Sequence, residues 1–305
     1  MIKMLSELNY KKPVYVLITA ARNEGRYIEK TIESIGRQTI LPFKWIIVND
    51  GSNDNTQDII NKYLFDYKFI EYKFIDSNNN RNFASKVYAI KRAEEMLIPI
   101  RYDYIGILDA DITLAKSYYE KVLKIFENNY NLGIACGVLK EYCRGKFENR
   151  IYSSWSVSGG IQLFRRECYE DIGGLIPLKW GGEDSIAEAV ARMHKWEVKS
   201  FPGIIGYHHK ATGTGNNNGI FSVCFQKGLQ DYYYGVHPIY QIVRCIRRVL
   251  KKPYIIGSLL QYIGFIWSYC KKDKIDIPQD ILQYIRKEQL TRLYKLLPYF
   301  SKVED

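Results

Sequence analysis

Residues 14–56, VYVLITAARNEGRYIEKTIESIGRQTILPFKWIIVNDGSNDNT, contain the pattern that decides the fold. The apolar, β-branched run at 14–19 predicts a buried parallel strand. Apolar residues then recur at helical spacing over 27–36, which predicts a helix. A second apolar run at 45–48 ends in a polar cluster, and 56–63 again has helical spacing. The stretch therefore predicts two consecutive β–α units.

The alternation continues with a strand over 68–75, a helix over 84–96 and a strand over 104–108. Four such alternations predict a doubly wound α/β fold, whose mixed, mostly parallel sheet has helices on both faces. Further along, the segments 134–140, 158–165 and 198–208 are strand-like and 185–195 is helical. From Pro238 onward the chain is helical and basic. We expect a catalytic domain over 1–235 and a helical region over 236–305.

The composition excludes several classes of protein. The chain has 305 residues, of which 47% are hydrophobic and 25% charged, so disorder and small disulfide scaffolds are excluded. Its six cysteines form no CxxC or zinc pattern, and no signal-peptide pattern is present, so we expect reduced thiols in the cytoplasm. The glycine-rich signatures of dinucleotide-binding and P-loop enzymes are also missing.

Carboxylates stand where the predicted strands end. Asp109 and Asp111 flank one small residue directly after a strand, and such a pair suits a divalent cation that also binds phosphate oxygens. The alternative is a turn whose Asp caps a helix from Ile112. Asp50, at the end of the second strand, suits a ribose hydroxyl or a base N–H. Asp54 can simply cap the helix that follows.

Two further clusters follow in the second half of the chain. Glu183 and Asp184 come after two glycines and open a predicted helix, where a carboxylate can stand close to a ligand and act as a general base. Acids favoured by the helix dipole are the simpler explanation. His208 and His209 end a strand, where such a pair is either structural or metal-binding.

Five segments in this order resemble the family 2 glycosyltransferases of the GT-A fold. They are VLITAARNE at 16–24, VNDGSNDNT at 48–56, ILDAD at 107–111, WGGED at 180–184 and YHH at 207–209. The resemblance spans roughly residues 13–215. It implies a GT-A sheet and a transferase of polysaccharide or lipid-linked-saccharide biosynthesis that uses a nucleoside-diphosphate sugar.

The resemblance also implies roles for single residues. Contacts to the nucleotide sugar would come from Thr19, Ala20, Arg22, Glu24, Asp50, Lys86 and Asp109. Ala20 departs from the family, which often has Pro there. Asp111 would hold Mg²⁺ or Mn²⁺ on the diphosphate, together with His208 or, as the second choice, His209. The general base of a single inverting displacement would be Asp184, with Glu183 second. Independently of the resemblance, the Gly/Asn content of 210–219 and its place directly after His208 and His209 predict a lid over the ligand.

The C-terminal region points to a membrane. Residues 253–270 hold no charge and are bracketed by Lys and Arg, and from residue 236 the chain carries 13 Lys and Arg against 6 Asp and Glu. A helix of this length spans about 27 Å, barely the hydrocarbon thickness. We expect a helix on an anionic membrane surface at the cytosolic face. Burial in the protein or in a homodimer, or a true span, are the alternatives.

Two other functions fit less well. A nucleotidyltransferase would need a Gly-rich basic loop after the first strand, where this chain has AARNE at 20–24. A nucleic-acid-binding protein would use the basic C-terminal region, but that charge brackets an apolar stretch and no nucleic-acid motif is present. We therefore expect a metal-dependent glycosyltransferase with no nucleic-acid partner.

Overall fold

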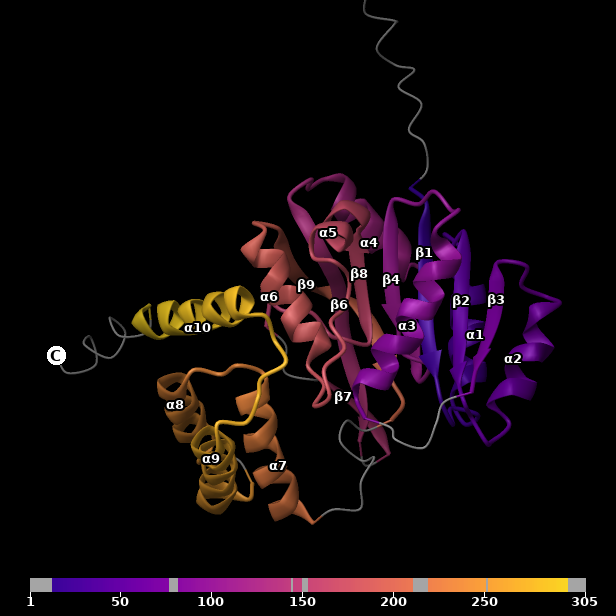
Figure 1. The fold of residues 1–305 in the computed structure, drawn as a ribbon. Helices are drawn as coiled ribbons and strands as arrows, with labels where there is room; N and C mark the ends of the chain where they lie inside the picture. Colours follow the sequence, from indigo (N-terminus) through magenta and orange to yellow (C-terminus); the bar gives the residue numbers. More distant parts are fainter. Residues whose placement is uncertain are drawn as a thin grey trace, which may run out of the picture. The chain divides into compact units, whose positions relative to one another are not determined.

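The computed structural model describes residues 13–76, 82–143, 145–149, 153–210, 219–250 and 252–295 (Figure 1). The chain forms two compact units. The first, called the sheet unit here, comprises 1–78, 88–173 and 196–210. The second, called the helical unit, comprises 79–87, 174–195 and 211–305. The expected division of function at residue 235 stays a prediction.

The sheet unit is built on a single mixed sheet in the order β3-β2-β1-β4-β8-β6-β9-β5, with β7 paired to β6 (Figure 1). Strands β1 to β4 are parallel, β8 is antiparallel to both β4 and β6, β6 is parallel to β9, and β5 is antiparallel to β9. The mixed α/β architecture predicted from the sequence is confirmed. The strands are β1 (Tyr15–Ala21), β2 (Lys44–Asp50), β3 (Ile70–Ile75), β4 (Tyr104–Leu108), β5 (Ile112–Leu114), β6 (Leu132–Cys143), β7 (Lys146–Asn149), β8 (Ile161–Arg165) and β9 (Glu197–His208).

The core of the sheet explains why the early strands are continuous apolar runs. Val16, Leu17 and Ile18 of β1 are fully buried, as are Ile46 and Ile47 of β2, because both faces of the sheet are covered. Helices α1, α2, α4 and α5 pack against β5, β3, β6 and β8, respectively. The helices in this part of the chain are α1 (Ile28–Gly36), α2 (Thr56–Leu64), α3 (Ala84–Leu97), α4 (Tyr118–Glu127) and α5 (Arg166–Asp171).

Three local features differ from the sequence prediction. Strand β1 does not end at residue 19 but continues through Ala21, because it pairs with β2 up to Asn49. Residues 112–114 form strand β5 rather than a capped helix, since they pair with the end of β9. Helices α4 and α5 and strand β7 have no counterpart among the predicted elements. Of the predicted lid, residues 211–218 lie outside the described part of the chain.

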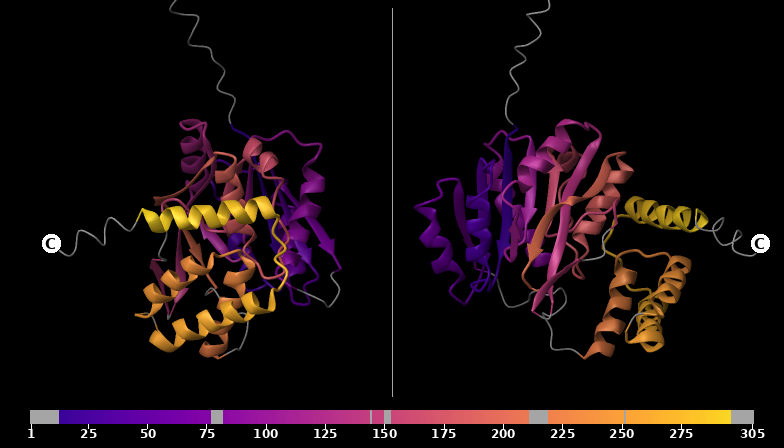
Figure 2. Two further views of the ribbon diagram at one scale, coloured as in Figure 1. Left: turned by 60° about the vertical axis from the view of Figure 1, so that its left-hand side comes forward. Right: turned by 180° about the vertical axis from the view of Figure 1, so that it is seen from behind.

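The helical unit contains α6 (Glu183–Met193), α7 (Ile220–Tyr233), α8 (Pro238–Arg248), α9 (Tyr254–Lys271) and α10 (Gln279–Tyr294). Helices α7 and α8 both pack on α9, and α10 packs on α6 and α8 (Figure 2). Two glycines let α7 and α9 approach closely. A Cβ on Gly228 would lie 1.9 Å from the Gln261 carbonyl oxygen, and one on Gly264 would lie 2.2 Å from that of Phe225. Among the described helices, none has the length and apolarity needed to cross a bilayer.

Candidate active site

The end of β1 is anchored to β2 by a buried hydrogen bond. Thr19 is fully buried, and its hydroxyl accepts a hydrogen bond from Trp45 Nε1 at 3.0 Å. A nucleotide contact of Thr19 would therefore have to come from its backbone. The next residue, Ala20, is half-buried and pairs with Val48.

The turns after β1 and β2 are tied to each other. Arg22 Nη1 donates to the carbonyl oxygen of Asp50 at 3.1 Å, and the Glu24 backbone N–H donates to Thr56 Oγ1 at 2.9 Å. Asp54 accepts from the backbone N–H groups of Thr56 and Gly25, each at 3.0 Å, so it ties the two turns together, while the N-cap residue of α2 is Asn55. These bonds place Arg22, Glu24 and Asp50 at one edge of the sheet, where parallel α/β sheets bind ligands.

The pairing of β5 with β9 brings the DAD motif and the histidines together. Ile112 lies opposite His208 in this register, so the preceding Asp111 meets the end of β9. Asp111 Oδ2 is 3.2 Å from His208 Nε2. The neighbouring Asp109 packs against Gly160, where a Cβ would lie 2.6 Å from Asp109 Oδ2. Asp111 and His208 are 97 residues apart in the chain and become one site through the sheet.

The two histidines have different partners. The ring Nδ1 of His208 is buried and has no hydrogen-bond partner among the described residues, and Glu141 Oε1 lies 3.8 Å from it. His209 Nε2 instead shares a hydrogen bond with Thr113 Oγ1 at 2.9 Å. The geometry thus favours His208 over His209 as the partner of Asp111. No sequence motif marked Glu141, which reaches this position through the register of β6 with β9.

Negative charge is concentrated at this edge of the sheet. Burial raises the pKa of Glu24, and the charges of Asp111 and Asp109 raise it further. Lys210 Nζ opposes this shift from 3.1 Å, while Glu24 Oε2 is buried without a hydrogen-bond partner in the described structure. Burial lowers the pKa of His208, but the hydrogen bond and charge of Asp111 outweigh it, so the net shift is upward. The cluster is suited to receive a cation.

The donor atoms fit a hard divalent cation that shares its coordination with a ligand. Within the described residues, no three His, Cys, Asp or Glu side chains form a metal-binding group by themselves. Asp111 and His208 offer one carboxylate and one imidazole at adjacent positions. Mg²⁺ commonly takes only one or two protein carboxylates and completes its shell with water and phosphate oxygens. The chemistry of the pair therefore fits a hard divalent cation that takes its remaining ligands from water or a bound ligand.

The helical unit contains the other predicted acids. Glu183 and Asp184 form the first turn of α6, whose N-cap Gly182 has a left-handed φ of 89° that favours glycine. Lys86 Nζ lies 4.0 Å from Glu183 Oε1. Asp184 Oδ1 accepts a hydrogen bond from the Ser185 N–H at 2.7 Å. The structure thus brings Lys86 and Glu183 together.

Aromatic residues at the C-terminal end of α7 contact the loop that precedes α6. The Tyr234 hydroxyl donates to the Trp180 carbonyl oxygen at 3.1 Å, and a Cβ on Gly182 would lie 2.7 Å from the Tyr234 ring. Trp180 stacks on Tyr233 with ring centroids 4.7 Å apart. Burial raises the pKa of Tyr234, and the charges of Asp184 and Glu183 add to that effect. Because the chain has 26 tyrosines, no sequence pattern marks Tyr234 for this role.

The chain matches known proteins in sequence. The family model described as "Glycosyl transferase family 2" matches residues 16–190. The chain is 27% identical over 214 residues to the poly-beta-1,6-N-acetyl-D-glucosamine synthase of Staphylococcus epidermidis, an alignment that covers 64% of this chain and 48% of that protein. An uncharacterized glycosyltransferase of Mycoplasma genitalium is 31% identical over 124 residues, 40% of this chain and 39% of its own length. The chain spans about half the length of the synthase.

Solved structures share the fold at low sequence identity. S. aureus TarS 1–349, in complex with UDP-GlcNAc, has a TM-score of 0.53 at 13% identity, with 83% of this chain and 71% of that chain covered. The mannosyltransferase PcManGT from Pyrobaculum calidifontis, in complex with GDP-Man and Mn²⁺, has a TM-score of 0.55 at 14% identity and covers 95% and 83%. These likenesses confirm the expected GT-A type of fold. Since the family match spans more than half of the sequence, the chain belongs to glycosyl transferase family 2.

Proposed function

We propose that the chain is an inverting glycosyltransferase that moves a sugar from a nucleoside-diphosphate sugar to a hydroxyl of a saccharide or lipid-linked acceptor. The observation that carries this proposal is the contact of Asp111 with His208 beside Asp109, at the edge of the sheet where strand ends meet. Family membership supports the reaction class. The nucleotide sugars bound by the solved structures of similar fold support the donor class.

The sheet unit holds the donor in this proposal. Asp50 accepts hydrogen bonds from the base or ribose, and Arg22, tied to the Asp50 carbonyl, keeps that turn in place. Asp109 contacts the ribose or the sugar, with Gly160 leaving room on its other side. Lys210, which is paired with Glu24, would stabilise negative charge on the departing diphosphate.

Asp111 and His208 would hold a Mg²⁺ or Mn²⁺ ion. When bound, that ion neutralises charge on the leaving diphosphate. The two protein groups keep their relative position through the β5–β9 pairing, so the site is organised before ligand arrives. The carboxylates of Asp109 and Glu24 near them would add negative potential that favours such a cation.

Asp184 is the proposed general base. It takes the proton of the acceptor hydroxyl as that oxygen attacks the anomeric carbon, on the face opposite the leaving group, so a single displacement inverts the configuration. The left-handed Gly182 before it leaves the loop without a side chain that would crowd an acceptor. Glu183 is held by Lys86 and orients the loop in this assignment.

The acceptor class suggests where the protein works. A lipid-linked acceptor would require the chain to lie at a membrane, and we place it peripherally on the cytosolic face of an anionic membrane. The segment 253–270, which has no charged residue and is flanked by Lys and Arg, supports this location. A homodimer would be compatible with the same assignment.

A thermal-shift series tests the proposal. UDP, GDP, UDP-GlcNAc and GDP-Man are each added with and without MnCl₂ to the wild type and to Asp111→Asn. At least one nucleotide with Mn²⁺ should raise the wild-type Tm by about 2–4 °C, because ligand binding adds to stability. Without ligand, Asp111→Asn should melt at the wild-type Tm. With nucleotide, it should lose the Mn²⁺-dependent part of the Tm shift. An equal shift in the variant would refute the metal assignment, and no shift with any nucleotide would refute this donor class.

A further inference from the structure

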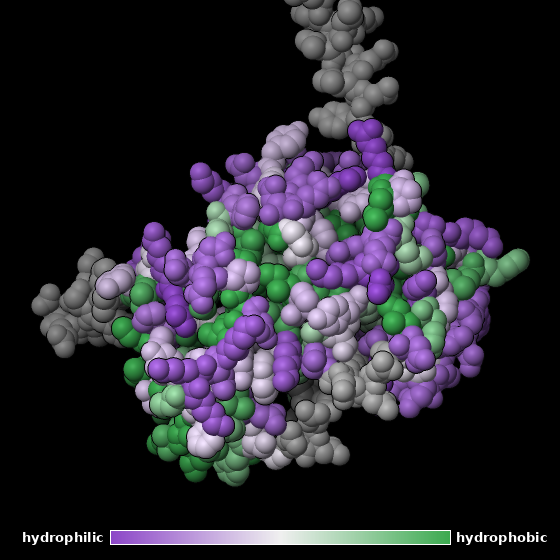
Figure 3. All heavy atoms as spheres, viewed as in Figure 1, coloured by the Kyte–Doolittle hydropathy of each residue, from purple (hydrophilic) through white to green (hydrophobic). Residues whose placement is uncertain are grey.

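The helical unit exposes an unusual amount of apolar surface. Of the 26 large apolar side chains that are exposed in the described residues, 14 lie in 220–271. On α9 the exposed positions Ile255, Leu259, Ile263 and Trp267 recur every four residues and form one continuous stripe. Figure 3 shows apolar residues at the lower left of the view, where α9 lies, with hydrophilic residues beside them. A stripe of this size is characteristic of an interaction site.

The interior of the same helices contains a buried polar cluster beside a small apolar core formed by Tyr232, Val236 and Phe265. Asp231 of α7 is 2% exposed and accepts a hydrogen bond from Gln241 of α8 at 3.0 Å. It accepts a second from Gln261 of α9, and Arg244 Nη1 lies 3.0 Å from its other oxygen. The face of α9 that points inward also contains small and polar residues, namely Gly257, Ser258, Gly264 and Ser268.

Helix α8 also exposes large aliphatic residues. Ile239, Ile242 and Ile246 are exposed at helical spacing, while Gln241 and Cys245 of the same helix are buried. Both helices thus bury small and polar residues, together with Phe265 of α9, and turn large aliphatic residues outward. Helices placed against hydrocarbon have this arrangement, since their polar groups must be satisfied within the protein.

The positive charge beside this apolar surface indicates an anionic partner. From residue 232 to residue 272 the chain has seven Lys and Arg and no Asp or Glu. Two copies of this chain joined through the same face would bring these like charges together, which opposes a symmetric dimer. An anionic bilayer instead offers both an apolar layer for the stripe and negative headgroups for the basic residues.

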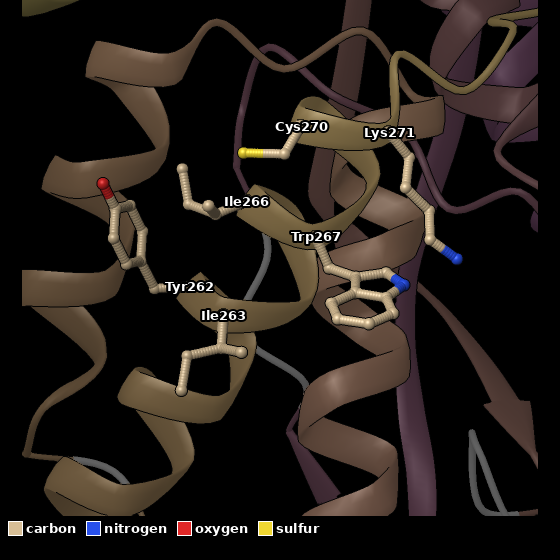
Figure 4. Close-up of a pocket in the computed structure, with 6 residues that line it drawn as sticks. All are labelled: Tyr262, Ile263, Ile266, Trp267, Cys270 and Lys271. Atoms are coloured by element: carbon tan, nitrogen blue, oxygen red, sulfur yellow. The ribbon is translucent and has the colours of Figure 1, made fainter.

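A groove on α9 matches the same chemistry on a smaller scale. It has a volume of about 490 Å³ and is lined by Tyr262, Ile263, Ile266, Trp267, Cys270 and Lys271 (Figure 4). Lys271 Nζ lies 4.6 Å from the centroid of the Trp267 ring at one end of the groove. An apolar channel with an ammonium group at its end suits an acyl chain and its anionic headgroup.

We propose that α8 and α9 together form the surface by which this protein lies on an anionic lipid bilayer. Their outward stripes, led by Ile242, Ile246, Ile255 and Leu259, enter the acyl boundary, and the flanking Arg and Lys contact the headgroups. This proposal rests on the membrane location proposed above and identifies the surface responsible for it. It does not depend on the chemistry of sugar transfer.

Vesicle sedimentation with the full chain tests the surface. The vesicles contain phosphatidylcholine alone or with 30% phosphatidylglycerol, and the variant is Ile255→Gln with Leu259→Gln. The matched control is Phe65→Gln with Ile98→Gln, because these two side chains are each 80% exposed in the sheet unit. Wild type and control should sediment with the anionic vesicles and be released by salt. The α9 variant should bind about 10- to 100-fold more weakly, from the apolar area it loses.

A second readout follows the contact of Trp267 with the bilayer. Brominated lipids should quench Trp267 fluorescence, so that quenching is largely lost in Trp267→Phe but kept in Trp155→Phe, whose tryptophan is 48% exposed in the sheet unit. Arg247→Gln with Lys252→Gln should weaken binding to anionic vesicles about 30-fold, as expected for removing two surface charges at about 1 kcal/mol each.

The results distinguish a wrong surface from a wrong membrane location and from a dimer. If the α9 variant binds like the wild type and Trp267 is not quenched, this surface is wrong while the membrane location stands. If the wild type binds no vesicle, both fail, yet the donor-binding test is unaffected. If the wild type is a dimer that the α9 variant dissociates, and it binds no vesicle, a second copy covers the face and the bilayer proposal is overturned.

Discussion

Gly160 offers a way to move the Asp109 carboxylate without removing it. A Cβ at this position would lie 2.6 Å from Asp109 Oδ2 and 2.6 Å from Ile112 Cδ1. To reach an ordinary contact of 3.4 Å, the carboxylate has to recede by roughly 0.8 Å. Both obstructing atoms are side-chain ends, so the sheet itself can stay in place. We expect Gly160→Ala to lose about 1–2 kcal/mol of unfolding free energy, typical of a mild overpacking.

Gly160→Ala should affect kcat/KM more strongly than it affects the stability of the fold. A displacement near 1 Å at a group that positions substrate costs up to about 10²-fold in rate, so kcat/KM for the donor should fall about 10- to 100-fold. The assay follows donor consumption, alongside thermal melting by circular dichroism. Gly203→Ala is the control, since a Cβ there meets nothing within 4 Å. A folded Gly160→Ala variant with wild-type kcat/KM would refute the assignment of Asp109 to the donor.

Three further predictions concern the base, the helix contact and the thiols. Asp184→Asn should lower turnover about 10²-fold or more with nearly unchanged donor affinity, and Glu183→Gln should do less; the reverse order in one kinetic assay exchanges their roles. Gly264→Ala should lower the unfolding free energy by about 1–3 kcal/mol despite the better helix propensity of Ala, because its Cβ would lie 2.2 Å from a backbone oxygen of α7; an unchanged denaturation midpoint contradicts the close contact. Cys168, whose pKa burial raises to about 12, should stay a thiol and resist iodoacetamide at pH 8 while the exposed Cys143 and Cys270 react; mass spectrometry that finds Cys168 equally labelled refutes this.

The predictable part of the fold is the part with strong local patterns. The central parts of β1 and β2, residues 15–18 and 45–48, are continuous apolar runs, because a parallel strand covered on both faces needs no alternation. Their positions are correct to within a few residues. Strand β5 has only three residues, too few for any periodicity to show, and it exists because β9 lies beside it. Local pattern alone cannot separate such a strand from a turn.

The candidate site shows the same division. The motifs identified Asp111 and His208 singly, and only the β5–β9 pairing shows that they touch. Glu141 carries no motif, and its approach to His208 depends on the register of two strands far apart in sequence. The hold of Tyr234 on the Trp180 loop likewise arises where α7 ends. Residues whose role depends on long-range packing leave no local signal.

The packing of helix α9 explains a sequence pattern that is ambiguous by itself. Its sequence alone allowed a membrane-surface helix, a buried helix or a true span, because its small and polar residues are scattered among aliphatic ones. Gly257 and Gly264 occur where the helix meets its neighbours, and Ser258, Gln261 and Ser268 share that buried side. The residues that dilute the hydrophobicity are therefore those that contact protein. What remains outward is almost wholly apolar, so the mean hydropathy of the segment understates its exposed face, and that face determines what the helix can bind.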